Sequence, residues 1–123
     1  MSEVIYDGRA ERPLLWLHGE VRTPPMSVRA RVRAGELLRR LQMGETLEMP
    51  QSRPMPAVGR LCHELRIPDG SRDWRVMYRV DRDAVVILEV FRKQTAATPR
   101  AVIETCRDRL RRYDAAAKEW PSS

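Results

Sequence analysis

The chain has 123 residues, which fits one domain and leaves little room for a second. Apolar residues make up 42% of it and charged residues 33%, which is too apolar for a disordered chain and too charged for a membrane protein. No apolar run approaches the roughly 20 residues of a spanning helix, and the N-terminus lacks the basic and apolar segments of a secretory signal. We expect one cytoplasmic domain over residues 1–123, with residues 1–11 and 115–123 loosely attached.

The chain is basic. Lys and Arg number 23 against 17 Asp and Glu, which gives a formal net charge of +6, and all the basic residues except Lys93 and Lys118 are arginines. The planar guanidinium group suits phosphate, and a basic balance favours an acidic partner such as nucleic acid. A GC-rich genome, whose codons favour arginine and alanine, explains the same excess, so composition leaves both explanations open.

The two cysteines, Cys62 and Cys106, are too few for a disulfide framework in a chain of this size. Neither belongs to a C-x-x-C pair, and His18 and His63 complete no spacing typical of metal ligands. We therefore expect two free thiols in a reducing compartment, no structural metal and no cofactor.

The first half of the chain predicts one strand and one amphipathic helix. Residues 13–18 are an apolar run typical of a strand. Ser27 is a good N-cap for a helix over residues 28–43, and Gly44 is suited to end it. Steps of three and four predict an apolar stripe on this helix that consists of Val28, Val32, Gly35, Leu38 and Leu41. Residues 45–59 contain three prolines, which exclude a regular helix there.

Three strands and a second helix follow. Short polar turns join residues 61–67, 74–80 and 84–91, which predicts an antiparallel meander. Thr98 and Pro99 indicate the N-cap and first residue of the final helix. The apolar stripe of this helix is Val102, Ile103, Cys106, Leu110 and Tyr113. The order strand-helix-strand-strand-strand-helix predicts an α+β fold, a small antiparallel sheet with both helices packed on one face.

Alternation along the strands separates the two faces of this sheet. If Leu65, Tyr78 and Leu88 face the helices, a period of two determines the other face. That face carries Glu64, Arg66, Arg75, Arg79, Glu89 and Lys93, with Met77 and Phe91 between them. An ordinary solvated face also alternates polar residues. Arginine beside apolar side chains, however, suits RNA, whose phosphates pair with arginine and whose bases stack.

Short motifs on these strands resemble a known group of proteins. Residues 63–66 (HELR), 74–79 (WRVMYR) and 90–95 (VFRKQT), followed by Thr98 and Pro99, are similar in order and spacing to the RelE/HigB toxin superfamily, most of all to its HigB-like, phage-derived branch. The resemblance implies a RelE-like fold and the toxin of a bacterial type II toxin–antitoxin system. It also implies a metal-independent endoribonuclease that cuts mRNA on the ribosome, by attack of the ribose 2′-hydroxyl on the adjacent phosphate. A cognate antitoxin with a helix-turn-helix domain would neutralise it.

The resemblance assigns roles to individual residues. Arg75 matches the arginine that would hold the scissile phosphate, and Arg92 and Lys93 match the basic pair that ends the last strand. Glu64 and Arg66 fall at the family's basic positions on the strand after the proline-rich loop. The implied catalytic residues are Glu64, Arg66, Arg75 and Lys93, and the expected RNA-binding residues are Arg60, Met77, Arg79, Phe91 and Arg92.

The acid and base of the reaction stay open at this point. Glu64 stands where RelE has a lysine, so it is either a general base or a salt-bridge partner of Arg66. Several members supply a tyrosine or histidine just beyond the last strand, whereas residues 94–99 contain neither. Either His63 or Tyr78 substitutes, or the chemistry runs without such a residue, or this member is a weak nuclease. Alternation places His63 and Tyr78 on the apolar side, which favours packing in the core for both.

Other functions also stay open. The ParE branch shares the fold and inhibits gyrase without catalysis, but it lacks the basic set Arg66, Arg75 and Lys93. A plain RNA-binding module needs only the basic face and would bind RNA in a salt-dependent way without a cyclic phosphate product. Met49 and Met55, in the proline-rich loop, fit either the edge of the core or a groove for the antitoxin.

Overall fold

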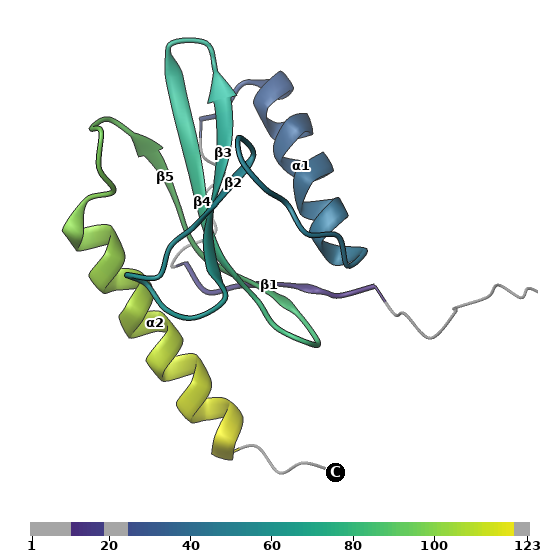
Figure 1. The fold of residues 1–123 in the computed structure, drawn as a ribbon, viewed down its shortest axis with the longest axis vertical. Coiled ribbons are helices and arrows are strands. Elements are labelled where there is room, and N and C mark those ends of the chain that lie inside the picture. The colour runs from purple at the N-terminus through teal and green to yellow at the C-terminus, as the bar shows by residue number, and fades with distance from the viewer. Residues whose placement is uncertain (1–10, 19–24, 120–123) are drawn as a thin grey trace, which may run out of the picture.

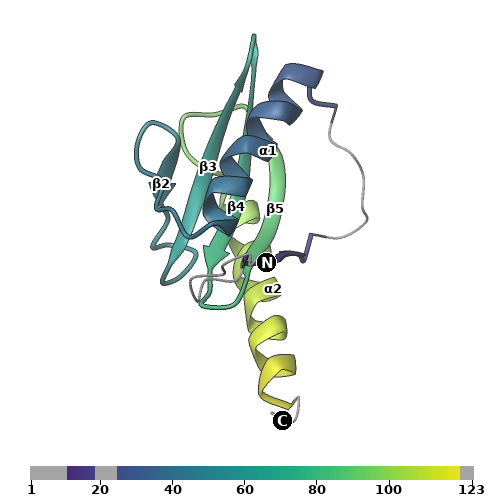
Figure 2. The same cartoon turned by 90° about the vertical axis from the view of Figure 1, so that its right-hand side faces the viewer.

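The computed structural model describes residues 11–18 and 25–119, and these form a five-stranded sheet with two helices (Figures 1 and 2). The elements in chain order are β1 (Leu14–Trp16), α1 (Val28–Gln42), β2 (Ser52–Pro54), β3 (Cys62–Asp69), β4 (Arg72–Val80), β5 (Val85–Lys93) and α2 (Arg100–Glu119). The α+β class is confirmed. Of the ends predicted to be loose, residues 1–11 and 115–123, the parts over residues 1–10 and 120–123 lie outside the described residues.

The strand order in the sheet is β1-β5-β4-β3-β2. The meander of β3, β4 and β5 is antiparallel, as predicted, and β1 adds a parallel edge beside β5. The sequence analysis missed β2, in which Ser52 and Arg53 pair with Leu65 and Glu64. This strand is only three residues long and ends in Pro54, and proline in a short run is typical of an edge strand that leaves no alternating pattern to detect.

Helix α1 begins at Val28, as predicted, and ends at Gln42, one residue before the predicted end, but it buries a different face. The Ser27 side chain accepts a hydrogen bond from the Ala30 amide, and Gly44 has the positive φ of 93° that favours glycine after a helix. The buried side chains are Ala30, Ala34, Leu37, Leu38 and Leu41. Val28 and Val32 are 74% and 56% exposed, so the predicted stripe was wrong for them, because two small alanines rather than the valines face the sheet.

The two helices cover opposite faces of the sheet, which corrects the prediction that both pack on one face (Figure 1). Helix α1 packs with Leu65, Trp74 and Tyr78, whereas α2 packs with Met77 and Leu88. The reason is that the central strands are apolar on both sides, and each side must be buried against a helix. We call these surfaces the α1 face and the α2 face.

Helix α2 uses the predicted apolar stripe. Cys106 and Leu110 are buried, and Val102, Ile103 and Tyr113 pack around them. The helix continues to Glu119 rather than fraying at residue 115. Among the described residues, neither helix combines the length and apolar character that crossing a membrane requires.

A bulge changes the register of the central strands. Met77 pairs with Glu89 and Tyr78 pairs with Ile87, so Leu88 has no partner of its own on β4. Leu88 therefore lies on the α2 face, contrary to the prediction that it shares a face with Tyr78. Arg109 on α2 donates a hydrogen bond to the Leu88 carbonyl at 2.6 Å, which satisfies a backbone group that the bulge leaves without a ladder partner.

We predict that Leu37→Ala lowers the free energy of unfolding by about 2–5 kcal/mol, because it removes a fully buried side chain from the core under α1. Val32→Ala on the exposed side of the same helix should change it by no more than about 0.5 kcal/mol. Urea denaturation of the two variants measures both values. A larger loss for Val32→Ala than for Leu37→Ala would contradict the observed orientation of the helix.

Candidate functional site

Three neighbouring rungs of the sheet carry polar side chains on the α2 face. The strand register pairs Arg53 with Glu64 and Glu64 with Met77. The next rung pairs Arg66 with Arg75 and Arg75 with Phe91. The third rung is made of Pro68, Asp73 and Lys93. Residues directly opposite on adjacent strands share a face, so Glu64, Arg66, Arg75 and Lys93 project to a common side, as predicted. This side is not the open surface that was expected, because α2 packs on part of it and Glu64 and Arg75 are buried.

The Glu64 carboxylate is the most buried charged group of these rungs, with 1% of its surface exposed. Arg53 Nη2 donates to Oε1 at 3.0 Å, and the Thr98 hydroxyl donates to Oε2 at 2.7 Å. Arg75 Nε lies 3.5 Å from Oε1. Glu64 is thus an ion-pair partner of Arg53 and Arg75, not of Arg66 as one of the two sequence-based interpretations had it.

Arg75 is held beside this carboxylate and is itself only 5% exposed. Its Nη1 donates to the Trp74 carbonyl at 3.1 Å, and its Nε has no hydrogen-bond partner among the described residues. Burial lowers the pKa of the Arg75 guanidinium, and the Glu64 charge opposes that shift. Arginine nevertheless keeps its proton because its ordinary pKa is so high, so the group is a fixed cation.

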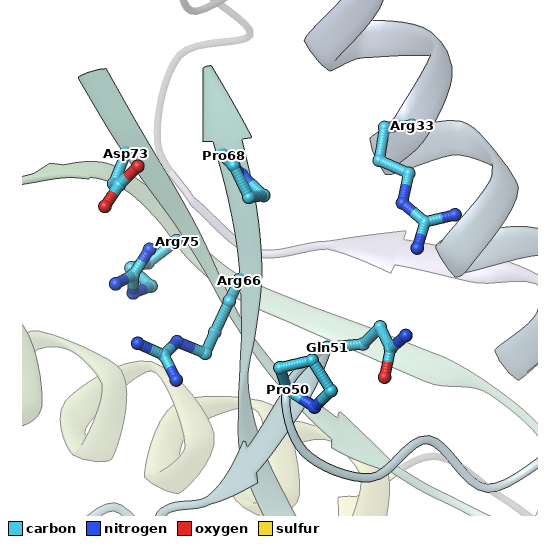
Figure 3. A pocket seen from close by; sticks show the side chains of 7 residues that line it. All are labelled: Arg33, Pro50, Gln51, Arg66, Pro68, Asp73 and Arg75. Atoms are coloured by element: carbon cyan, nitrogen blue, oxygen red, sulfur yellow. The ribbon is translucent and has the colours of Figure 1, made fainter. Parts of the chain in front are cut away.

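Arg66 stands directly opposite Arg75 and is half-buried (Figure 3). The two side chains point to the same side of β3, and the Arg66 guanidinium also lies 4.0 Å from the Met49 sulfur. Two like charges on one rung repel each other. An anion placed between them would relieve that repulsion, which makes the pair a candidate phosphate site.

A pocket of about 300 Å³ opens next to this pair, at the edge of β3 beyond β2 (Figure 3). Its walls are Arg33, Pro50, Gln51, Arg66, Pro68, Asp73 and Arg75. The Arg66 amide donates to the Gln51 carbonyl, and Pro68 has no amide hydrogen to pair further along the edge. The edge of β3 is therefore open here, where a ligand reaches the arginine pair from solvent.

Lys93 completes the site from the end of β5, opposite Asp73. Burial lowers the pKa of its ammonium, Glu64 raises it, and the charges of Arg75, Arg53 and Arg66 lower it further. The net direction is downward, so Lys93 releases its proton more readily than an ordinary lysine.

The predicted RNA-binding residues do not all join this group. Arg92 pairs with Trp74 and lies on the α1 face. Met77 is completely buried and cannot offer a platform for a base, and Phe91 is half-buried against the core under α2. Arg79 shares the α2 face, but together with the exposed Arg60 it lines a different depression. The predicted RNA-binding residues therefore lie on both faces of the sheet and at both of its ends, and they do not form one surface.

His63 and Tyr78 lie on the α1 face, as alternation predicts. Their rings are stacked with centroids 5.4 Å apart, and the Tyr78 hydroxyl is 2.6 Å from the hydroxyl of the buried Ser52. Burial raises the pKa of Tyr78. Neither side chain reaches the rungs that carry Arg66 and Arg75. Tyr78 is therefore a core residue, and His63 is half-buried beside it, so neither is placed to act as the catalytic acid of this site.

Sequence reasoning missed Arg53 and Thr98 as members of the site. Arg53 falls in the proline-rich segment, where no strand was predicted to give it a side of the sheet. Thr98 was expected to cap α2, but its hydroxyl bonds Glu64 instead. The position of Thr98 gave a partial signal for its place in the site. A threonine just after the last strand lies at the same end of the sheet as Lys93.

We predict that Thr98→Val destabilises the protein by about 1–3 kcal/mol, because it leaves a buried oxygen of Glu64 without its donor. Thr98→Ser keeps a hydroxyl and should lose far less. Equilibrium unfolding of the matched pair tests this, and equal stabilities for valine and serine would show that the bond to Glu64 contributes nothing.

Comparisons with known proteins place the chain in a family. Residues 25–111 match the family described as Phage derived protein Gp49-like (DUF891). The match spans α1, strands β2 to β5 and the first half of α2. No curated protein and no solved structure was found to match the chain. Because the matched region is well over half of the sequence and includes every residue of the three rungs, the chain belongs to the phage-derived Gp49-like family.

Proposed function

We propose that this protein is the toxin of a type II toxin–antitoxin system, a metal-independent endoribonuclease that cleaves mRNA on the ribosome. The family membership and the resemblance to HigB-like toxins support this proposal. The observation that carries it is the rung on which Arg66 and Arg75 stand side by side at an open pocket, with Lys93 on the next rung.

The reaction needs no water nucleophile. The ribose 2′-oxygen attacks the adjacent phosphorus, the bond to the 5′-oxygen of the next nucleotide breaks, and the products are a 2′,3′-cyclic phosphate and a 5′-hydroxyl. Arg66 and Arg75 hold the non-bridging oxygens as charge builds up on them, and one such donor is typically worth about 10²–10³ in rate. The leaving 5′-oxygen takes a proton from water.

Lys93 accepts the proton of the 2′-hydroxyl. Its lowered pKa increases the neutral fraction that a general base requires. Glu64 is the less suitable base, because its oxygens are buried and already contacted by Arg53, Thr98 and Arg75. Glu64 is instead a positioning residue that keeps Arg75 in place.

The partners follow from this function. The enzyme would act in the cytoplasm on mRNA bound to the ribosome, and its net charge of +6 favours association with RNA. A cognate antitoxin with a helix-turn-helix domain would neutralise it. Of the two methionines weighed for an antitoxin groove, Met55 is buried in the core whereas Met49 is 56% exposed beside Arg66, so only Met49 is accessible to a partner.

We predict that induced expression arrests bacterial growth and that Arg66→Ala relieves the arrest. The substitution removes a phosphate contact, and it leaves no cavity in the core because Arg66 is only half-buried. Arg75→Ala should do the same. Arg92→Ala removes an equal charge from the α1 face and should leave the arrest intact. Growth curves with matched protein levels, supported by unfolding curves of each variant, give the result.

Arrest that survives both Arg66→Ala and Arg75→Ala would place the toxic activity elsewhere on the molecule. Purified protein that stalls gyrase but leaves ribosome-bound mRNA intact would instead favour the non-catalytic alternative.

We predict that the cleavage rate rises with pH, since Lys93 must lose its proton to act. The midpoint of the rise should lie below the ordinary pKa of lysine, because burial lowers the pKa of Lys93. Lys93→Arg keeps the charge but cannot give up a proton near neutral pH, so it should reduce the rate by about 10²–10⁴ and abolish the rise. Single-turnover cleavage of ribosome-bound mRNA across pH measures both. If Lys93→Arg retains the wild-type rate, Lys93 acts only through its charge.

A further inference from the structure

A second basic depression lies at the other end of the α2 face. It has a volume of about 290 Å³ and is formed between the end of the β2–β3 loop and α2. Four arginines line it, and Asp114 is the single carboxylate among the lining residues. They are Arg60, Arg79, Arg107 and Arg111. None of them belongs to the three rungs of the candidate site.

Arg79 forms the fixed part of this depression. Its guanidinium donates to both oxygens of Asp114 at 2.8 and 3.0 Å, and to both oxygens of Asp81 at 2.7 and 2.9 Å. These bonds hold a residue of β4 to a residue of α2. They also occupy Asp114, so the carboxylate in the depression already has its counter-charge.

The rim is positively charged and accessible. Arg60, Arg107 and Arg111 are exposed, and neither Arg60 nor Arg107 forms an ion pair with a described residue. Arg111 pairs with Asp108 at 2.7 Å, with 74% and 37% of the two side chains exposed. An exposed pair of this kind is worth little, so Arg111 can turn to a better anion. Three guanidinium groups thus surround one concave surface.

The chemistry of the depression favours a phosphate backbone over a protein. The apolar residues that line it, Val58 and Leu110, are 5% and 7% exposed, so it presents no accessible apolar or aromatic anchor of the kind that dominates protein interfaces. Exposed arginines around a depression without an apolar anchor are typical of contacts to RNA phosphates, and such contacts do not read the sequence of the bases.

We propose that this depression is a second RNA-binding site, which holds a backbone phosphate of the same single strand that the Arg66–Arg75 pair cleaves. The inference rests on the proposed function for the identity of the strand. Arg75 and Arg79 are four residues apart on β4, which is about 13 Å at 3.3 Å per residue, a span that a few nucleotides cover. The rim arginines therefore add affinity and do not take part in the chemistry.

The test is the binding of a 12-nucleotide single-stranded RNA, labelled with fluorescein and made uncleavable by 2′-O-methyl groups, measured by anisotropy at several salt concentrations. The double variant Arg60→Ala/Arg107→Ala should weaken binding by about tenfold or more. The slope of log K against log salt should fall by about 0.7, the contribution of the one phosphate that the depression holds on a single strand. Arg29→Ala/Arg31→Ala removes the same charge from the exposed side of α1 and should leave the slope unchanged.

Unchanged binding by Arg60→Ala/Arg107→Ala would overturn the inference, and so would an equal loss in the α1 control, since that would reflect net charge alone. Tighter binding of a poly-glutamate peptide than of the RNA would assign the depression to a protein partner. This readout does not require cleavage. An RNA affinity that depends on Arg60 and Arg107 in a protein that cuts no mRNA would support the site and overturn the nuclease.

Discussion

The buried carboxylate of Glu64 is the constraint on which the rest of the site depends. A carboxylate with 1% of its surface exposed is tolerated only when it is paired and hydrogen-bonded, and its partners come from three parts of the chain. Arg53 belongs to β2, Arg75 to β4 and Thr98 to the segment before α2. The same charge keeps the guanidinium group of Arg75 beside that of Arg66. Without it, several neighbouring cations would have no buried counter-charge.

The architecture explains why this cluster lies where it does. Helix α1 covers one face of the sheet and α2 covers part of the other, under Cys106 and Leu110. The bulge at Leu88 turns both Leu88 and Glu89 toward α2. Arg109 on α2 contacts both residues, by a hydrogen bond to the Leu88 carbonyl at 2.6 Å and an ion pair with the Glu89 carboxylate at 3.4 Å. The end of the α2 face that the helix leaves uncovered carries polar residues, so the fold itself confines the basic side chains to an edge that a ligand can reach.

The sequence predicts the elements of this fold better than their packing. Ser27, Gly44 and the alternation that separates Arg75 from Trp74 act locally, and each is found as predicted. The errors concern long-range contacts. A period of two places Leu88 with Tyr78, and only the pairing with β4 reveals the bulge that moves it. Local patterns also cannot show which helix covers which face.

In the candidate site, too, local patterns predict part of the arrangement and long-range contacts decide the rest. The common side of Arg66, Arg75 and Lys93 follows from strand alternation, whereas the contacts of Glu64 with Arg53 and Thr98 join segments 11 and 34 residues away in sequence. We propose that Arg66 and Arg75 bind one phosphate together, with Lys93 beside them as the base. NMR of the arginine and lysine side chains during titration with an uncleavable 2′-O-methyl RNA tests it most directly. We expect the signals of Arg66, Arg75 and Lys93 to shift with one common dissociation constant while that of Arg92 stays in place. A shift at Arg92 with none at Arg66 and Arg75 would contradict the proposal.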